Sequence, residues 1–168
     1  ILKTMIKVLS KPIHFLRSAS IGSFIGILPG AGSPIAAIVS YNEAVRWSKD
    51  KSEFGKGNIH GVTASEIANN SAAPAAMIPL VTLGVPGSSP AAVIAGALML
   101  RGLNPGPELF ATDGVLVYSF GWSMFIAGIV VFFVGLLATP LLVKVIKIPL
   151  RLLAPLIMFL AIIGAYAI

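Results

Sequence analysis

The stretch PGAGSP at positions 29–34, matched in kind by PGSSP at positions 86–90, decides how this chain folds. Each stretch combines a Pro-Gly turn with a serine and a second proline, and small residues follow each. Serine is a preferred helix N-cap and proline is favoured in the first helical turn, so each stretch ends one helix and begins another. We therefore predict half-helices that begin at Ser33 and Ser89, inside longer apolar segments.

Both stretches lie in segments that carry no charge. The uncharged segments are 18–42 (25 residues), 67–100 (34), 114–143 (30) and 152–168 (17). A membrane-spanning helix needs about 20 apolar residues, and the first three segments exceed that length. The chain has 57% hydrophobic and 11% charged residues and a mean hydropathy of +0.94, which excludes an ordinary soluble domain. The composition predicts an all-α integral membrane protein in a lipid bilayer.

The net charge of +6 comes from basic residues gathered in three groups, with Arg101 apart. The groups are Lys3, Lys7, Lys11 and Arg17; Arg46, Lys49, Lys51 and Lys56; and Lys144, Lys147 and Arg151. A nucleic-acid-binding surface would add aromatic residues on a soluble scaffold, so no nucleic acid is expected as a partner. Short basic loops between apolar segments indicate the cytoplasmic side of a membrane.

Placing all three basic groups on that side predicts a re-entrant helical hairpin at 17–47. Basic residues flank this segment on both sides, so a single crossing would leave one group outside. Half-helices at about 17–28 and 34–47, joined at the Pro-Gly tip, enter and leave on the same side. A continuous helix would tolerate that tip poorly.

The rest of the chain follows from the same rule. The pattern at 63–66 resembles a capping box and predicts the start of a helix, which breaks at 84–87 and ends at Gly102. The expected order is a basic cytoplasmic lead-in (1–16), the re-entrant hairpin (17–47), a cytoplasmic loop (48–62), a broken transmembrane helix (63–102), a periplasmic loop (103–113), a transmembrane helix (114–143), a cytoplasmic loop (144–151) and the start of a last transmembrane helix (152–168).

The long helix at 114–143 carries Gly121, Gly128 and Gly135 at heptad spacing. In lipid, such a stripe of small residues lets helices approach closely, so we predict a packing face. Pro140 is expected to bend the helix near its end.

The two breaks are the candidate binding site. Unpaired backbone N–H groups in hydrocarbon cost several kcal/mol each, whereas a helix N-terminus suits a carboxylate or phosphate. Two such ends near the midplane match the general plan of secondary-transporter sites, although plain kinks or packing points remain the alternative. The candidate substrate-binding residues are Pro29, Gly30, Ala31, Gly32, Ser33, Asn69, Asn70, Gly84, Pro86, Gly87, Ser88 and Ser89.

Few other residues offer chemistry. The two asparagines could contact a ligand or form interhelical hydrogen bonds, Glu66 could cap its helix or couple an ion, and Arg101 could snorkel or contact substrate. His14 and His60 are isolated and the chain lacks cysteine, so neither a metal site nor another cofactor is expected. No nucleophile, acid pair or phosphate loop is present, which argues against an enzyme.

A longer string of motifs resembles one family. It reads Gly22-x3-Gly26-x2-Pro29-Gly30-x-Gly32, Ala36-Ala37, Ser40-Tyr41, Ser48-Lys49, Phe54-Gly55-x-Gly57, Gly61-Val62, Glu66-x2-Asn69-Asn70, Pro79-Leu80, Thr82-Leu83-Gly84-x-Pro86-Gly87 and Gly102-Leu103-x-Pro105-Gly106-Pro107. In this order, the string resembles the large membrane subunit of the tripartite tricarboxylate transporters, the TctA family. Ser33-Pro34 and the segment 71–76 depart from the family's pattern.

The resemblance implies the permease of a carboxylate uptake system in the bacterial inner membrane. It also implies a periplasmic substrate-binding protein and a small membrane subunit as partners, and Na⁺ or H⁺ as the coupling ion. This chain would be the second half of an inverted-repeat, elevator-type transporter. Its start at Ile1 and its end in an apolar run suggest an internal fragment. Another ion-coupled carrier and a channel-like scaffold remain alternatives.

Overall fold

A computed structural model describes residues 6, 8, 10–146 and 149–166, and all its regular elements are helices. Parts of the predicted lead-in (1–5, 7 and 9), of the loop at 144–151 (147–148) and of the last helix (167–168) lie outside the described residues. The chain forms two compact units, Ile1–Phe120 and Gly121–Ile168. The all-α prediction is confirmed for the described residues.

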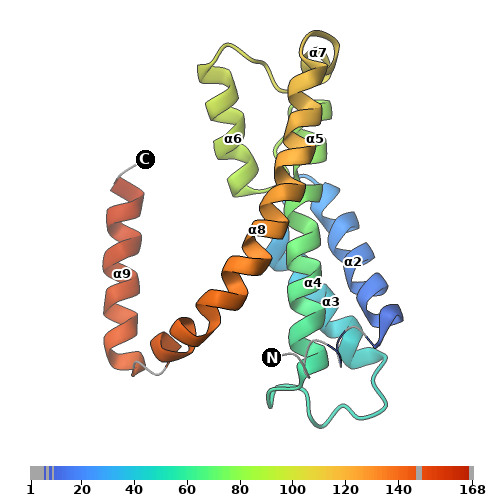
Figure 1. The fold of residues 1–168 in the computed structure, drawn as a ribbon, viewed down its shortest axis with the longest axis vertical. Helices are drawn as coiled ribbons and strands as arrows, with labels where there is room; N and C mark the ends of the chain where they lie inside the picture. The colour runs from blue at the N-terminus through green and yellow to red at the C-terminus, as the bar shows by residue number, and fades with distance from the viewer. Residues whose placement is uncertain (1–5, 7, 9, 147–148, 167–168) are drawn as a thin grey trace. The chain divides into compact units, whose positions relative to one another are not determined.

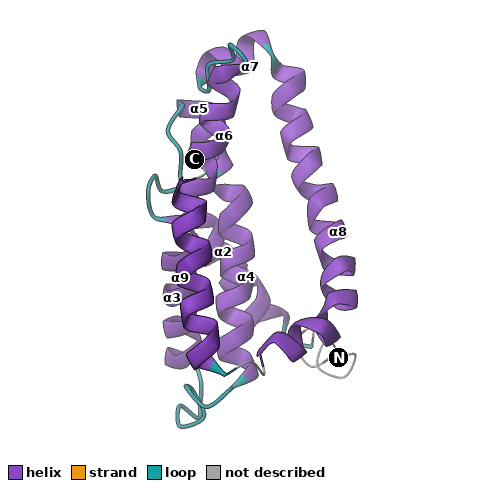
Figure 2. Ribbon diagram, turned by 90° about the vertical axis from the view of Figure 1, so that its left-hand side faces the viewer, coloured by secondary structure: helices purple, strands orange, loops and turns teal. Residues whose placement is uncertain are grey.

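The first unit is built on a helical hairpin with a third helix packed against it (Figure 1, Figure 2). Helix α2 (Pro12–Ile27) and helix α3 (Gly32–Arg46) are joined by a short turn, and α4 (Ile59–Ala75) packs against both. The two hairpin helices lie close to their predicted positions, each a few residues longer at its N-terminal end. A helical hairpin at this place is what the Pro-Gly tip predicted.

The three helices meet through small residues spaced mostly four apart. The buried residues are Ser18, Gly22 and Gly26 on α2; Gly32, Ala36, Ser40 and Ala44 on α3; and Gly61, Ala64, Ala68, Ala72 and Ala75 on α4. Spacing of four puts residues on one face of a helix, so each helix presents a narrow stripe without bulky side chains. Such stripes let helix backbones approach closely.

The contact between α2 and α4 leaves no space for a side chain on α2. A Cβ atom placed on Gly22 would lie 2.3 Å from the carbonyl oxygen of Ala68. One placed on Gly26 would lie 2.5 Å from the carbonyl oxygen of Ala72. The buried Ser40 hydroxyl donates a hydrogen bond of 2.9 Å to the Ala64 carbonyl, which ties α3 to α4. The sequence analysis assigned this packing role to glycines of the long helix and missed the α2 stripe.

Large apolar side chains lie on the outside of this unit. Phe24 is 68% exposed, Ile38 is 62% exposed and Val93 is 68% exposed, whereas most of the buried hydrophobic residues are alanines. A protein that folds in water buries its large apolar residues first, because burial of each contributes about 1.5–3 kcal/mol. This unit has small residues inside and large apolar residues outside, which is the reverse of the arrangement in a protein that folds in water.

Helix α4 begins one turn earlier than predicted. Its N-cap is Asn58, whose side-chain oxygen accepts a hydrogen bond of 2.8 Å from the His60 backbone N–H. Thr63 already lies inside the helix and donates its hydroxyl to the Ile59 carbonyl at 2.8 Å. The capping-box prediction at 63–66 is therefore wrong, and Glu66 does not cap a helix. Asparagine is as good an N-cap as threonine or better, and it comes first along the chain.

Beyond α4 the chain forms shorter helices, α5 (Met77–Leu83), α6 (Ser89–Leu100) and α7 (Pro107–Thr112). Helix α6 ends at Leu100 with Arg101 as its C-cap residue, one residue before the predicted cap Gly102, which follows at a φ of 76°. The N–H groups of Gly102 and Leu103 bond the carbonyls of Met99 and Leu98, a Schellman-type ending. Helix α7 lies within the predicted loop 103–113 and packs on α5, with Leu109 buried.

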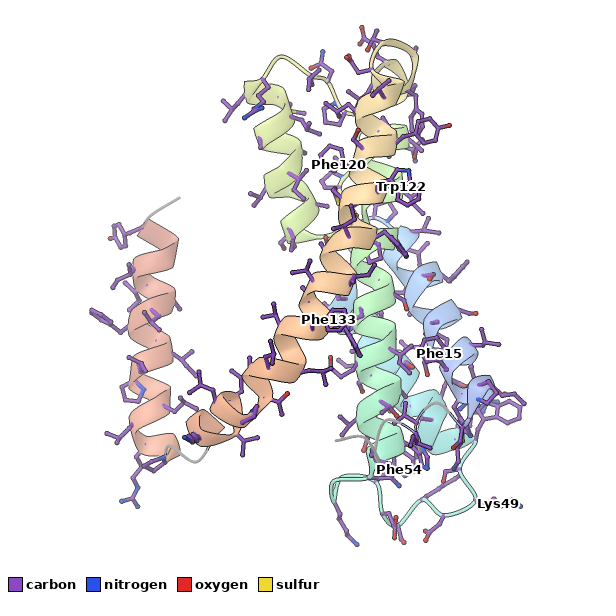
Figure 3. All side chains as sticks on the ribbon, viewed as in Figure 1. Phe15, Lys49, Phe54, Phe120, Trp122 and Phe133 are labelled. Carbon is purple, nitrogen blue, oxygen red and sulfur yellow. The ribbon has the colours of Figure 1, made fainter. Side chains whose placement is uncertain are left out.

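The second unit contains most of α8 (Gly114–Ile146) and all of α9 (Leu150–Tyr166). Of the helices described, α8 alone is long and apolar enough to cross a membrane, with a mean hydropathy of 2.6 over Gly114–Lys144. Trp122 and Phe133 on this helix, labelled in Figure 3, are exposed. Pro140 lies inside the helix, which continues past it. No described atom outside the helix lies within 4 Å of a Cβ placed on Gly121, Gly128 or Gly135.

Candidate functional site

The first helix break is a tight turn with an open tip. The Ala31 N–H donates to the Leu28 carbonyl at 3.2 Å, and Gly30 and Gly32 adopt φ angles of 77° and 67°, which favour glycine. Around Gly30, no described atom lies within 4 Å of an added Cβ. Helix α3 begins at Gly32 with Ala31 as the N-cap residue and without a side-chain cap. The prediction of Ser33 as N-cap is therefore wrong.

The second break turns the chain between α5 and α6. Gly84, at a φ of 72°, ends α5, and its N–H bonds the Leu80 carbonyl at 2.9 Å. Ser88 is extended and caps α6, because its hydroxyl oxygen accepts a hydrogen bond of 3.3 Å from the Ala91 N–H. The sequence analysis placed this cap one residue too late, at Ser89. Pro90 occupies the first helical turn as expected.

A third interruption separates α4 from α5 at Ala76 and was not predicted. Its cause is Pro79, because a proline lacks the N–H that would bond the carbonyl four residues earlier, here that of Ala75. Pro74 lies in the last turn of α4 and loosens the same region. The two prolines are the sequence signal for this interruption, which has no glycine to mark it.

Backbone contacts bring the second break against the end of the first half-helix. A Cβ placed on the buried Gly87 would lie 2.9 Å from the Gly26 carbonyl oxygen and 3.0 Å from the Ala76 Cα and carbonyl oxygen. Gly26 lies in the last turn of α2, four residues before Gly30. Figure 1 shows the start of α6 at the level where α2 ends and α4 passes into α5. The three interruptions therefore lie in one region of the first unit.

The predicted site residues differ in exposure, and among the described residues no contact links Asn69 or Asn70, which lie earlier on α4, to either break. Gly32 and Gly87 are buried, Ala31, Ser33, Asn69, Gly84, Pro86 and Ser88 are half-buried, and Pro29, Gly30, Asn70 and Ser89 are exposed. Gly84 faces the loop before α7, since its Cβ would lie 2.6 Å from the Pro105 carbonyl oxygen. Packing thus explains why Gly84 and Gly87 are glycines. The open space at Gly30 is the remaining feature that a ligand could use.

Several backbone N–H groups at both breaks have no hydrogen-bond acceptor among the described residues. Among the hydrogen bonds of the described residues, the N–H groups of Gly30, Gly32 and Ser33 have no acceptor. The same holds for the N–H groups of Gly87, Ser88 and Ser89. Those of Gly32, Ser33, Ser88 and Ser89 belong to helix starts, which leave such donors unpaired, whereas Gly30 and Gly87 lie just before the N-cap residues.

The two asparagines are not equivalent. The Asn70 amide donates a hydrogen bond of 2.8 Å to the Glu66 carbonyl of its own helix. The half-buried Asn69 side chain makes no hydrogen bond to any described residue. Ser71 and Thr82 likewise bond carbonyls of their own helices, those of Ile67 and Ile78. Asn69 is therefore, with Ser33 and Ser89, one of the polar side chains of the predicted site that make no hydrogen bond within the described chain.

Among the residues that the structure describes, no acidic or basic side chain belongs to either break. Glu66 and Arg101 are exposed, and Arg101 is the C-cap residue of α6. Among the described residues, no three His, Cys, Asp or Glu side chains gather as a metal ion would require. What the two breaks offer is backbone N–H groups and serine hydroxyls, and α4 adds the amide side chain of Asn69 outside them. These groups can bind an anion but carry no catalytic acid or base.

The fold and this region define an all-helical protein whose helices pack through small residues and break at glycine and proline. The chain belongs to the tripartite tricarboxylate transporter TctA family, which it matches over residues 2–168.

Two curated relatives come from Agrobacterium vitis. An uncharacterized 52.8 kDa protein in the TAR-I ttuC' 3' region is 40% identical over 153 residues, which cover 91% of this chain and 30% of the relative. An uncharacterized protein in the TAR-II ttuC' 3' region is 41% identical over 147 residues, which cover 88% of this chain and 61% of the relative. The chain thus spans less than two thirds of either relative. No solved structure matches it.

Proposed function

We propose that this chain is part of the membrane permease of an ion-gradient-driven carboxylate uptake system. Membership of the tripartite tricarboxylate transporter family supports this function. The packing supports a bilayer as the solvent, because small residues fill the interior and large apolar residues face outward. The whole protein would be a multi-pass protein of the bacterial inner membrane, and it would carry its cargo without chemical change.

In this proposal the hairpin of α2 and α3 is re-entrant, with both outer ends on the cytoplasmic side. Helix α4, its interruptions and α6 together cross to the periplasm, and α8 returns. The basic residues support this orientation, since the loop between α3 and α4 carries Lys49, Lys51 and Lys56. Glu108 and Asp113, in the segment that includes α7, would face the periplasm.

The substrate carboxylate would bind at the two breaks. The observation that carries this proposal is the contact of Gly87 with Gly26 and Ala76, which places the second break against the end of the first half-helix. Leftover N–H donors at Gly30, Gly32 and Ser33 and at 87–89 would receive the carboxylate oxygens, helped by the positive ends of the α3 and α6 dipoles. Asn69 would add a side-chain donor.

The remaining parts of the system are proposals drawn from the family. A periplasmic binding protein would deliver the carboxylate, and a small membrane subunit would accompany the permease. Na⁺ or H⁺ would supply the energy by moving down its gradient. The chain would be one half of an inverted repeat, whose two halves together enclose the substrate.

Transport by the whole protein with its two partners tests this function. In proteoliposomes, we expect saturable uptake of labelled citrate or a related carboxylate that needs both the binding protein and an imposed Na⁺ or H⁺ gradient. Flux that continues without either would point to a channel-like scaffold and overturn the proposal.

A matched pair of variants tests the site separately. Asn69→Ala should raise the apparent KM about fivefold, as expected for loss of a hydrogen bond worth about 1 kcal/mol. Asn70→Ala should change it less, because that amide already bonds Glu66. Equal effects of the two substitutions, or none, would remove Asn69 from the site while leaving the transport function standing.

A further inference from the structure

A pocket at the outer end of the hairpin gathers basic side chains from separate parts of the first unit. Its polar lining comes from Lys11, His14, Arg17, Ser18, His60 and Thr63. Lys11 precedes α2, His14 lies in the first turn of α2, and His60 lies in the first turn of α4. This pocket is at the opposite end of α2 from the candidate carboxylate site. The sequence analysis judged the two histidines to be isolated, but the fold brings them together.

The basic groups are in direct contact. The Lys11 Nζ lies 3.0 Å from the His60 Nε2, and the Arg17 Nη2 lies 3.1 Å from the His14 Nδ1. The two imidazole rings stack with centroids 6.0 Å apart and an angle of 24° between planes. Ammonium and guanidinium groups only donate hydrogen bonds, so both imidazoles accept through an unprotonated nitrogen. Four groups that are cationic when protonated therefore share one small volume.

The electrostatics of the pocket are unbalanced. No carboxylate is among the described residues that line it. Glu43 on the adjacent helix α3 accepts hydrogen bonds from the Trp47 indole at 2.9 Å and from Arg46 at 3.3 Å. Burial lowers the pKa of His14, which lies at the outer, cytoplasmic end of the proposed hairpin, and the charges of Arg17 and Lys11 lower it further. The charge of Glu43 interacts with that of Arg17, so this carboxylate balances part of the positive charge from outside the lining, while His14 is shifted towards its neutral form.

We propose that this pocket binds a phosphate group. A phosphate has several acceptor oxygens and one or two negative charges, which match Lys11, Arg17 and the two histidines as donors. The first turns of α2 and α4 both contribute to the pocket, and the positive ends of the two helix dipoles favour an anion there. A bound phosphate would supply the negative charge that no lining residue provides.

The phosphate has two chemical sources. It is either the headgroup of an anionic phospholipid or free inorganic phosphate. The headgroup agrees with the place of the pocket, which is at the same end of the hairpin as the basic loop between α3 and α4. Basic pockets between helices on the cytoplasmic side are typical binding places for lipid headgroups.

The test uses the whole protein in nanodiscs and compares two probes. One arm compares phosphatidylglycerol with phosphatidylcholine as the lipid, and the other adds inorganic phosphate to phosphatidylcholine discs. We expect a rise in the unfolding midpoint in one arm, which identifies the source. Titration in that arm should show affinity about tenfold weaker for Lys11→Gln, equivalent to about 1.4 kcal/mol.

A matched control separates a specific pocket from general attraction between charges. Lys56→Gln removes the same charge from an exposed position outside the pocket and should leave affinity unchanged. His60→Gln should weaken binding as Lys11→Gln does, and each variant's midpoint without phosphate or anionic lipid reports whether it folds. If neither probe raises the midpoint, or if Lys56→Gln weakens binding as much as Lys11→Gln, the proposal is overturned.

Discussion

Gly26 is one of the two glycines on which the close contact between α2 and α4 depends. Its Cα faces the Ala72 backbone and the Ala75 Cβ, so a methyl group there would lie 2.5–2.8 Å from these atoms. Gly26→Ala should therefore push α2 from α4 and lower the free energy of unfolding by about 1–3 kcal/mol, as overpacking does. Thermal unfolding of the purified protein measures this effect.

Gly96 on α6 provides the matched control for this substitution. No described atom outside its own helix lies within 4 Å of an added Cβ. Alanine there should be neutral or should stabilise the helix by up to about 1 kcal/mol, because glycine costs a helix conformational entropy. Equal destabilisation by the two alanines would contradict the close contact at Gly26.

Valine at Gly87 or Gly32 would not serve as a clean test of substrate access. Gly87 packs against backbone atoms, and Gly32 has a positive φ that L side chains rarely adopt. Either substitution would disturb the fold whether or not a ligand approaches there. Asn69, whose side chain has no partner among the described residues, is a better probe because its replacement removes a donor without adding bulk.

At the scale of a helix, the two adjacent serines at the start of α6 have different roles, since Ser88 caps the helix and Ser89 does not. Ser88→Ala removes the oxygen that accepts from the Ala91 N–H and should destabilise the first turn by about 1 kcal/mol. Ser89→Ala changes an exposed side chain that is not the cap and should have little effect. Amide hydrogen exchange at Ala91 and Ala92 measures the difference. Faster exchange in the Ser89 variant than in the Ser88 variant would show that the cap is misassigned.

Helix boundaries show what local sequence could predict and what it could not. Pro-Gly turns marked the breaks correctly and Gly102 marked the end of α6 to within one residue, because their backbone preferences are local. The N-caps were less certain, because several adjacent residues can cap and the packing of the helix decides among them. Asn58 was preferred to Thr63, Ala31 to Ser33, and Ser88 to Ser89.

The candidate site was predictable as two separate breaks but not as one region. Nothing local indicated that Gly87 would lie against Gly26, since the two are far apart in the chain. Local sequence likewise could not predict the contact between His14 and His60, which are far apart in the chain and whose rings stack in the folded structure. Residue pairs of this kind depend on how α2 and α4 pack, and that packing depends on the stripe at Ser18, Gly22 and Gly26.

For the whole molecule, the proposed orientation makes a prediction about access from the two sides of the membrane. Lys51 and Glu108 are both exposed and lie in different connecting segments. In a cysteine-free version of the whole protein, a cysteine at position 51 should react with an impermeant reagent only from the cytoplasm. A cysteine at position 108 should react only from the periplasm. Reaction of both from the same side would contradict the proposed path between them.

The contact at Gly87 also affects which segments of the first unit can move independently. Gly87 meets Gly26 and Ala76 without an intervening side chain, so no rotamer change can absorb a displacement between these segments. We therefore expect the end of α2, the junction of α4 with α5 and the start of α6 to move together. Gly30, with free space around it, and the turn itself remain able to change shape. Any rearrangement that opens or closes this region would carry the three segments together and place its flexing at the hairpin tip.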